Sequence, residues 1–185
     1  MQIVAIVTGI SGVGKSRLLA KVMRKSQGQL LVASDLIADE LSMRGERAVS
    51  RDKLRELDIT KNQRMFAAGF ARRADRTTDL IVLDAHVVID TPRGLEPMSA
   101  DVFLNIGANL IVFVEDEPER ILKHRIKDKT RQRPVRDLDT LREQQTLAKS
   151  VAAGIAKNLE IDFHVISSGD VAALKDVLRT PGHIR

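Results

Sequence analysis

The sequence contains no cysteine, tryptophan or tyrosine, and its aromatic residues are five phenylalanines. Without cysteine the chain can form neither disulfides nor thiolate metal sites. With aromatic residues at 3%, it offers no evident surface for stacking nucleic-acid bases. No apolar run approaches the roughly 18 residues that span a bilayer, and the N-terminus shows no basic region followed by a cleavable apolar stretch. We therefore expect a cytoplasmic protein with no membrane segment.

The bulk composition is that of one globular domain. The chain has 185 residues, 43% hydrophobic and 30% charged, and we expect a single domain over residues 1–185. The net charge of +5 comes from 30 Lys and Arg against 25 Asp and Glu. A basic excess can indicate nucleic-acid binding, but the densest basic cluster, in residues 127–136, is short and better sized for a polyphosphate. The composition therefore argues against a nucleic-acid partner.

A glycine-rich stretch near the N-terminus carries the strongest signal in the sequence. Residues 9–16, GISGVGKS, fit the phosphate-binding pattern G-x-x-x-x-G-K-[ST] at every fixed position. The apolar run at residues 3–7 predicts a buried parallel strand before the loop, and the apolar stripe in residues 17–23 predicts a helix after it. That flanking pattern disfavours the alternative, an ordinary glycine turn. The stretch predicts a P-loop.

The residue types in this loop suit a triphosphate. Glycines let successive backbone N–H groups approach a phosphate, and the following helix adds its N-terminal amides and dipole. Lys15 would reach the β- and γ-phosphates, and the Ser16 hydroxyl would meet Mg²⁺. We expect ATP as the phosphoryl donor. The residues expected to bind it are Gly9, Ser11, Gly12, Val13, Gly14, Lys15, Ser16 and Arg17.

The remaining patterns alternate between strands and helices, which predicts a parallel sheet covered on both faces. The further strands are expected over residues 30–33, 79–84, 109–114 and 163–166. Further helices are expected over residues 34–43, 60–74, 99–106, 117–128, 138–159 and 171–178, with a short one beginning at 50. Ser34 or Asp35 should cap the first of these and Thr60 the second. Residues 90–97 are expected to form a turn-rich loop, and residues 129–137 an exposed connection. Phe66 and Phe70 should lie in the core.

A carboxylate stands at the end of the strand predicted over residues 79–84. Ligands of parallel sheets bind beyond the carboxyl ends of the strands, so Asp84 should lie near the P-loop and could hold Mg²⁺, with a turn cap as the alternative role. Ala85 follows it, where a water-activating ATPase often has Glu. His86 lies near the same cleft, although a lone histidine is more often structural.

The order of these features resembles the nucleoside monophosphate kinases, and more closely the archaeal type of adenylate kinase. The resemblance covers nearly the whole chain and rests on four segments, at residues 7–16, 51–58, 82–94 and 128–133. It implies a P-loop nucleoside-kinase-like three-layer α/β sandwich with a five-stranded parallel sheet. It also implies a monophosphate-binding part at about residues 34–75, a short arginine-bearing lid at about residues 128–137, and a homotrimer.

The resemblance also implies an activity and a set of residues. The activity is ATP- and Mg²⁺-dependent transfer of a phosphoryl group to a nucleoside monophosphate, with AMP favoured, so that ATP and AMP give two ADP. The catalytic residues would be Lys15, Arg125, Arg131 and Arg133. The acceptor-binding residues would be Asp35, Arg51, Arg55 and His86, and the metal ligands Ser16 and Asp84.

The sequence departs from the family pattern mainly in its acceptor half. Asp90 stands where a basic residue is expected, and residues 95–98 lack the expected aromatic residue. His124 occupies a position that is often arginine, and residues 134–136 look inserted in the lid. Three alternatives stay open. The first is a P-loop kinase for another small molecule, and the second is a nucleotide-binding regulatory ATPase that acts through a protein partner. The third is a nucleic-acid-linked role for the basic surface.

Overall fold

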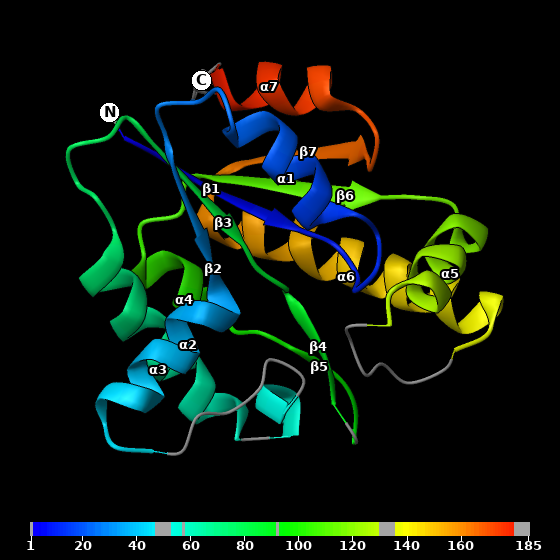
Figure 1. Ribbon diagram of the computed structural model, residues 1–185, viewed down its shortest axis with the longest axis horizontal. Coiled ribbons are helices and arrows are strands. Elements are labelled where there is room, and N and C mark those ends of the chain that lie inside the picture. Colours follow the sequence, from blue (N-terminus) through cyan, green and yellow to red (C-terminus); the bar gives the residue numbers. More distant parts are fainter. Residues whose placement is uncertain (1, 47–52, 57, 92, 130–135, 180–185) are drawn as a thin grey trace.

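A five-stranded sheet forms the centre of the molecule (Figure 1). The computed structural model describes residues 2–46, 53–56, 58–91, 93–129 and 136–179. All strand pairs in the sheet are parallel, in the order β2-β3-β1-β6-β7. The strands are β1 (Ile3–Thr8), β2 (Gln29–Val32), β3 (Leu80–Asp84), β6 (Leu110–Glu115) and β7 (Asp162–Ser167). The predicted five-stranded parallel sheet is confirmed.

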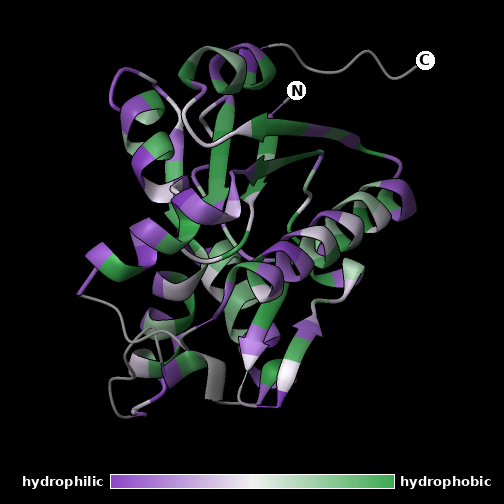
Figure 2. Ribbon diagram, turned by 90° about the vertical axis from the view of Figure 1, so that its right-hand side faces the viewer, coloured by the Kyte–Doolittle hydropathy of each residue, from purple (hydrophilic) through white to green (hydrophobic). Residues whose placement is uncertain are grey.

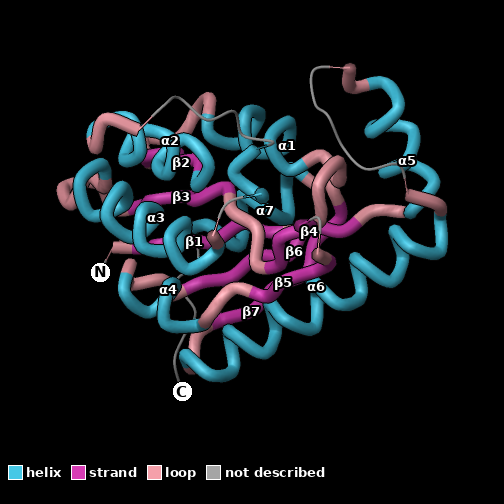
Figure 3. Tube along the Cα trace, turned by 90° about the horizontal axis from the view of Figure 1, so that it is seen from below, coloured by secondary structure: helices cyan, strands magenta, loops and turns pink. Residues whose placement is uncertain are grey.

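Helices cover both faces of this sheet and complete three layers. Figure 1 shows α1 and α7 above the sheet and α4 and α6 below it, and the view from below in Figure 3 shows α6 running across the near face. α2 and α3 pack against each other beside β2. The helices are α1 (Lys15–Met23), α2 (Ala33–Met43), α3 (Ile59–Arg73), α4 (Ala100–Asn105), α5 (Pro118–Lys127), α6 (Leu138–Leu159) and α7 (Val171–Arg179).

The core lies between the layers, where the strands are most apolar. Figure 2 shows the central strands in the hydrophobic green of its scale and hydrophilic purple on the outer turns of the helices. Ala5, Ile6 and Val7 of β1 are fully buried, as both-sided coverage of a parallel strand requires. Phe66 and Phe70 are each 1% exposed, so their predicted place in the core is confirmed. None of the helices in the described part of the chain combines the length and the hydropathy that a membrane span requires.

The prediction of a loop at residues 90–97 was wrong. β4 (Val88–Thr91) and β5 (Gly94–Pro97) form an antiparallel hairpin, in which Thr91 pairs with Gly94. Thr91 Oγ1 donates to the Gly94 carbonyl at 2.9 Å and accepts from the Arg93 amide at 3.1 Å, so this buried side chain closes the turn. Each strand has only four residues, too few for a clear alternation of polar and apolar residues.

Two predicted helix starts were also displaced. α2 begins at Ala33 directly after β2, so Ser34 and Asp35 lie inside its first turn instead of capping it. α3 begins at Ile59, and its cap is Asp58, whose side chain accepts from the Lys61 amide at 2.8 Å, not Thr60. The short helix expected from residue 50 is described only as a 3₁₀ turn, η1 (Lys53–Glu56), since residues 50–52 lie outside the described residues.

The packing of α3 on α2 depends on a glycine. A Cβ added at Gly69 would lie 2.7 Å from the carbonyl oxygen of Leu36, which is helix backbone and cannot move aside alone. Gly154, in the middle of α6, has nothing within 4 Å of the corresponding position. The two glycines therefore form a matched pair.

We predict that Gly69→Ala lowers the free energy of unfolding by about 1–3 kcal/mol, because overpacking forces α2 and α3 apart. Gly154→Ala should leave it unchanged or raise it by up to about 1 kcal/mol, because alanine favours the helix. Denaturant unfolding of both variants measures the two effects. Equal stability of the two variants would contradict the assigned packing.

Candidate active site

The P-loop geometry requires glycine at the positions that the motif specifies. Gly9, Gly12 and Gly14 have φ values of 148°, 87° and 103°, in the region that other residues rarely adopt. A Cβ at Gly9 would lie 2.4 Å from the carbonyl oxygen of Val114, and one at Gly12 would lie 2.6 Å from Cγ of Arg125. The loop therefore passes directly against β6 and α5, and α1 begins immediately after it at Lys15.

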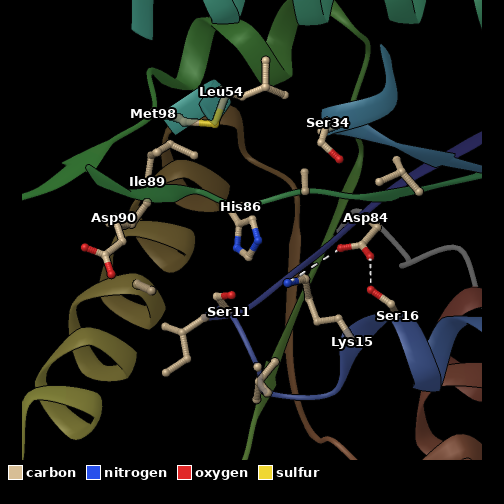
Figure 4. Close-up of a pocket in the computed structure, with 18 of the residues that line it drawn as sticks. Ser11, Lys15, Ser16, Ser34, Leu54, Asp84, His86, Ile89, Asp90 and Met98 are labelled. Atoms are coloured by element: carbon tan, nitrogen blue, oxygen red, sulfur yellow. Dashed lines mark hydrogen bonds and ion pairs between the residues drawn. The ribbon is translucent and has the colours of Figure 1, made fainter. Parts of the chain in front are cut away.

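A buried lysine joins the loop to the end of β3. Lys15, 5% exposed, donates from Nζ to the Gly9 carbonyl at 3.1 Å and lies 3.7 Å from Asp84 Oδ1. Ser16 Oγ donates to Asp84 Oδ2 at 2.9 Å. The dashed lines in Figure 4 mark the interactions of Asp84 with Lys15 and with Ser16. β1 and β3 are neighbours in register, with Val7 opposite Asp84, so the P-loop and the carboxylate emerge at the same edge.

Ser16 and Asp84 fit Mg²⁺. Their hard oxygen atoms, brought to 2.9 Å, are the ligands that Mg²⁺ prefers. Mg²⁺ usually takes only one or two protein ligands beside phosphate oxygens and water. The described residues contain no group of three or more His, Asp or Glu side chains that could hold a metal by themselves.

Two more side chains hold the loop from outside. His86 Nδ1 lies 2.9 Å from the Gly9 carbonyl oxygen, which can only accept, so Nδ1 carries a hydrogen. Arg125 Nε donates to the Ser11 carbonyl at 2.8 Å, and its side chain lies over Gly12. The carbonyl oxygen of Gly9 thus accepts hydrogen bonds from both Lys15 and His86. These bonds hold the backbone of the P-loop in its observed conformation.

The P-loop forms one end of a cavity of about 580 Å³. From there the cavity extends between α2, α3 and η1 on one side and the β4–β5 hairpin and α6 on the other. Leu54, Ile89 and Met98 lie together along the far wall in Figure 4. Cavities of this size and largely apolar lining hold small molecules. The cavity lining also has polar members outside the P-loop, which include Ser34, Asn62, Gln63, Asp90 and Gln144.

Asp90, the acidic replacement noted in the sequence, is paired in the structure. Its Oδ1 lies 3.1 Å from Arg136 Nη2, and its Oδ2 accepts from Gln144 Nε2 at 3.4 Å. Asp90 comes from the hairpin. Arg136 lies just before α6, and Gln144 lies in the second turn of α6. The carboxylate therefore ties the hairpin to α6 at the edge of the cavity.

The structure brings most of the predicted donor-site residues to this cavity. Those that line it are Ser11, Gly12, Val13, Gly14, Lys15, Ser16, Arg17, Asp84 and Arg125. Gly9 contributes its carbonyl oxygen instead. His86, predicted to bind the acceptor, also lines the cavity and contacts the P-loop carbonyl of Gly9. Asp35 is partly buried in the first turn of α2 and is not among the lining residues. Arg51, Arg131, Arg133 and the side chain of Arg55 lie outside the described residues, so their roles stay predictions.

Sequence reasoning missed three amide side chains that line the cavity. Asn62, Gln63 and Gln144 lie on helices whose sequence predicts only that one face is buried. Gln144 is 5% exposed, which is rare for an uncharged polar side chain of this length. Its spacing from Leu141 and Ala148 on the buried face of α6 was the only available signal.

A second carboxylate braces the P-loop from the end of β6. Asp116 accepts hydrogen bonds from Ser168 Oγ, the Glu117 amide and Arg120 Nε. Ser168 in turn lies beside the P-loop, 3.6 Å from the Cβ position of Gly14. Burial alone would raise the pKa of Asp116, but the hydrogen bonds from Ser168, Glu117 and Arg120 outweigh it, so the pKa lies below its usual value.

Comparisons with known proteins agree with this geometry. A family model described as an AAA domain matches residues 8–142. The adenylate kinase of Pyrococcus abyssi is 30% identical over 183 residues, with 96% of this chain and 92% of the relative covered. The adenylate kinase of Thermoplasma acidophilum is 31% identical over 156 residues, or 80% of each chain.

Two solved structures resemble the fold. A shikimate kinase from Bacteroides thetaiotaomicron superposes with a TM-score of 0.58 at 15% identity and covers 96% of this chain and 99% of its own. A gluconokinase from Sinorhizobium meliloti 1021 gives 0.52 at 13% identity, over 96% and 90% of the two chains. The α/β sandwich described above is therefore the fold of P-loop kinases.

We predict that Asp116→Asn lowers stability at neutral pH by about 1–3 kcal/mol, because it removes hydrogen bonds to a charged group. A lowered pKa favours folding above the ordinary carboxyl pKa near 4, and the benefit disappears as the pH falls through the lowered value. The stability difference from wild type should therefore shrink below about pH 4. Urea unfolding of both proteins between pH 7 and pH 3 measures this difference in the free energy of unfolding.

Asp139→Asn is the control for that series. The Asp139 side chain is 85% exposed and pairs only with Arg142 among the described residues, so its loss should change stability little at any pH. A constant difference between Asp116→Asn and wild type from pH 7 to pH 3 would show that the charge of Asp116 contributes nothing.

Proposed function

The chain belongs to the AAA domain family, and from that premise we propose that it transfers the γ-phosphoryl group of ATP to a nucleoside monophosphate, with AMP the leading acceptor. The P-loop supports the donor half of the reaction. The archaeal adenylate kinases that match the chain over most of its length support the acceptor half. We propose that one kinase domain carries both, and we keep the cytoplasmic location and the trimer as predictions.

The observation that carries this proposal is the placement of Lys15, Ser16 and Asp84 at one end of the cavity. Two interactions, Lys15 with Asp84 and Ser16 with Asp84, join the P-loop to β3 there, and the rest of the cavity extends away from them with room for a second substrate. A kinase needs the donor and the acceptor in line at a single site, because positioning supplies much of the rate. A cavity with a phosphate-binding end and an apolar end meets that need.

The residues of the site divide the chemistry among them. Lys15 would neutralise charge on the transferring phosphoryl group, and Arg125, already folded over the loop, would add a second cation. Mg²⁺, held through Ser16 and Asp84, would supply further charge neutralisation on the phosphate oxygens. A phosphate acceptor is already ionised and scarcely needs a general base. Many ATPases have a water-activating glutamate directly after this aspartate, and this chain has Ala85 at that position.

A second candidate is phosphoryl transfer to another small molecule, and Asp90 favours it. The carboxylate of Asp90 lines the cavity at a position where the family resemblance implies a basic residue. A carboxylate suits hydroxyl or amino groups better than a second phosphate. The pairing of Asp90 with Arg136, however, offsets its charge.

We predict that ADP forms from ATP and Mg²⁺ when AMP is added, and that Lys15→Met lowers kcat/KM about 100-fold or more through lost charge stabilisation. Lys21→Met, on the exposed side of the same helix, should keep wild-type turnover. A coupled assay with each nucleoside monophosphate and a control without acceptor measures both. Turnover with a sugar or another hydroxyl acceptor, and with none of the monophosphates, would favour the second candidate.

A further inference from the structure

An ion pair joins two parts of the chain that meet beside the cavity. Asp90 Oδ1, in β4, lies 3.1 Å from Arg136 Nη2, and Asp90 Oδ2 accepts a longer bond of 3.4 Å from Gln144 Nε2 in α6. The side chains of Asp90 and Arg136 are only 18% and 32% exposed. Water and salt therefore screen this pair less than a fully exposed one. Two departures from the family pattern meet in it, since Arg136 ends the segment 134–136.

The arginine has a fixed place at the start of α6. Arg136 directly precedes Asp137, the N-cap residue whose side chain accepts from the Thr140 amide at 2.7 Å. Arg136 Nε is buried and has no hydrogen-bond partner among the described residues, so this part of the guanidinium group lies against protein. A cation in such a place depends on a counter-ion to compensate for its lost hydration. Asp90 supplies that compensation.

The aspartate belongs to an element that depends on contacts with its neighbours. β4 and β5 are strands of four residues each, and a two-stranded hairpin by itself is marginally stable in water. Asp90 pairs with Leu95 across the hairpin, so the two side chains lie on the same face. Both residues line the cavity. A contact that holds Asp90 therefore also places Leu95 in the cavity wall.

The Asp90 carboxylate is not directed at the reacting groups. In Figure 4 it points away from His86, which lies 2.9 Å from the Gly9 carbonyl oxygen of the P-loop. Both of its oxygens are within hydrogen-bond reach of Arg136 or Gln144. The carboxylate thus contacts the start of α6, at the part of the cavity away from the donor site.

We propose that Asp90 and Arg136 are positioning residues, which set the affinity for the phosphoryl acceptor by holding the β4–β5 hairpin against the start of α6. The inference rests on the proposed function, since it places the acceptor beside the hairpin, but it applies to a monophosphate and to another small acceptor alike. Asp90 acts through Arg136 and makes no contact with the acceptor. The P-loop end of the cavity is built from other residues and does not depend on the pair.

Exchanging the two charges tests the pair. Asp90→Arg and Arg136→Asp each bring like charges together, so each should raise KM for the acceptor about 10-fold and leave kcat and KM for ATP within about twofold of wild type. The double variant Asp90→Arg/Arg136→Asp restores opposite charges, so its acceptor KM should return most of the way to the wild-type value. A direct contact between Asp90 and the acceptor predicts no such recovery.

Asp139 and Arg142 provide the matched control. They form an ion pair within the first turns of the same helix, but their side chains are 85% and 57% exposed. Asp139→Arg, Arg142→Asp and the double variant should therefore all keep the wild-type acceptor KM. Should a charge-reversed variant of the Asp90 pair not fold, Asp90→Asn and Arg136→Gln remove one charge without adding another and should raise the acceptor KM in the same direction.

Amide hydrogen exchange of the hairpin tests the pair without any substrate. The exchange rates of the β4 and β5 amides should rise about 10-fold in each single variant and recover in the double variant, because a released hairpin opens more often. Wild-type acceptor KM in both single variants, or a double variant as impaired as Asp90→Arg, would overturn the proposal. If wild-type protein phosphorylates no acceptor, the proposed function fails on its own. Hydrogen exchange then decides the inference, and equal rates in all variants would overturn it.

Discussion

The site depends on one buried cation, Lys15, held between the carbonyl of Gly9 and the carboxylate of Asp84. A buried ammonium group is tolerated only when nearby acceptors compensate for its lost hydration. Here the compensation comes from the loop itself and from the neighbouring strand. The same interactions that make Lys15 tolerable in the interior place its Nζ where the donor phosphates would lie. The stability of the site and its chemistry therefore share one set of contacts.

The other elements act by holding this arrangement in place. β6 passes behind Gly9, α5 lays Arg125 across Gly12, and the turn after β7 sets Ser168 beside Gly14. The approaches at Gly9 and Gly12 are close enough to require a glycine, and Arg125 also donates a hydrogen bond to the loop, which leaves the loop little freedom to change shape. The other end of the cavity is built differently. Its lining comes from α3, η1, the β4–β5 hairpin and α6, which are separated along the chain.

These two ends differ in how well the sequence predicts them. The strands were predicted because their apolar runs are nearly continuous, and α6 was predicted over residues 138–159 as observed. The hairpin at residues 88–97 was missed because two four-residue strands carry almost no periodicity, and Asp58 was missed as a cap because Thr60 fits the same signal. It could not be predicted that Asn62 Oδ1 accepts no hydrogen bond from the described residues, since a helix sequence does not show what lies opposite each side chain.

The sequence by itself determined the P-loop, the parallel sheet and the position of Asp84, because each follows from local spacing and from the rule that parallel strands end at one edge. Only the tertiary structure decided how the rest of the cavity is arranged. The pairing of Asp90 with Arg136 and the packing of Gly69 on Leu36 both join residues far apart in the chain. Such contacts depend on the relative placement of whole elements, which no local pattern encodes.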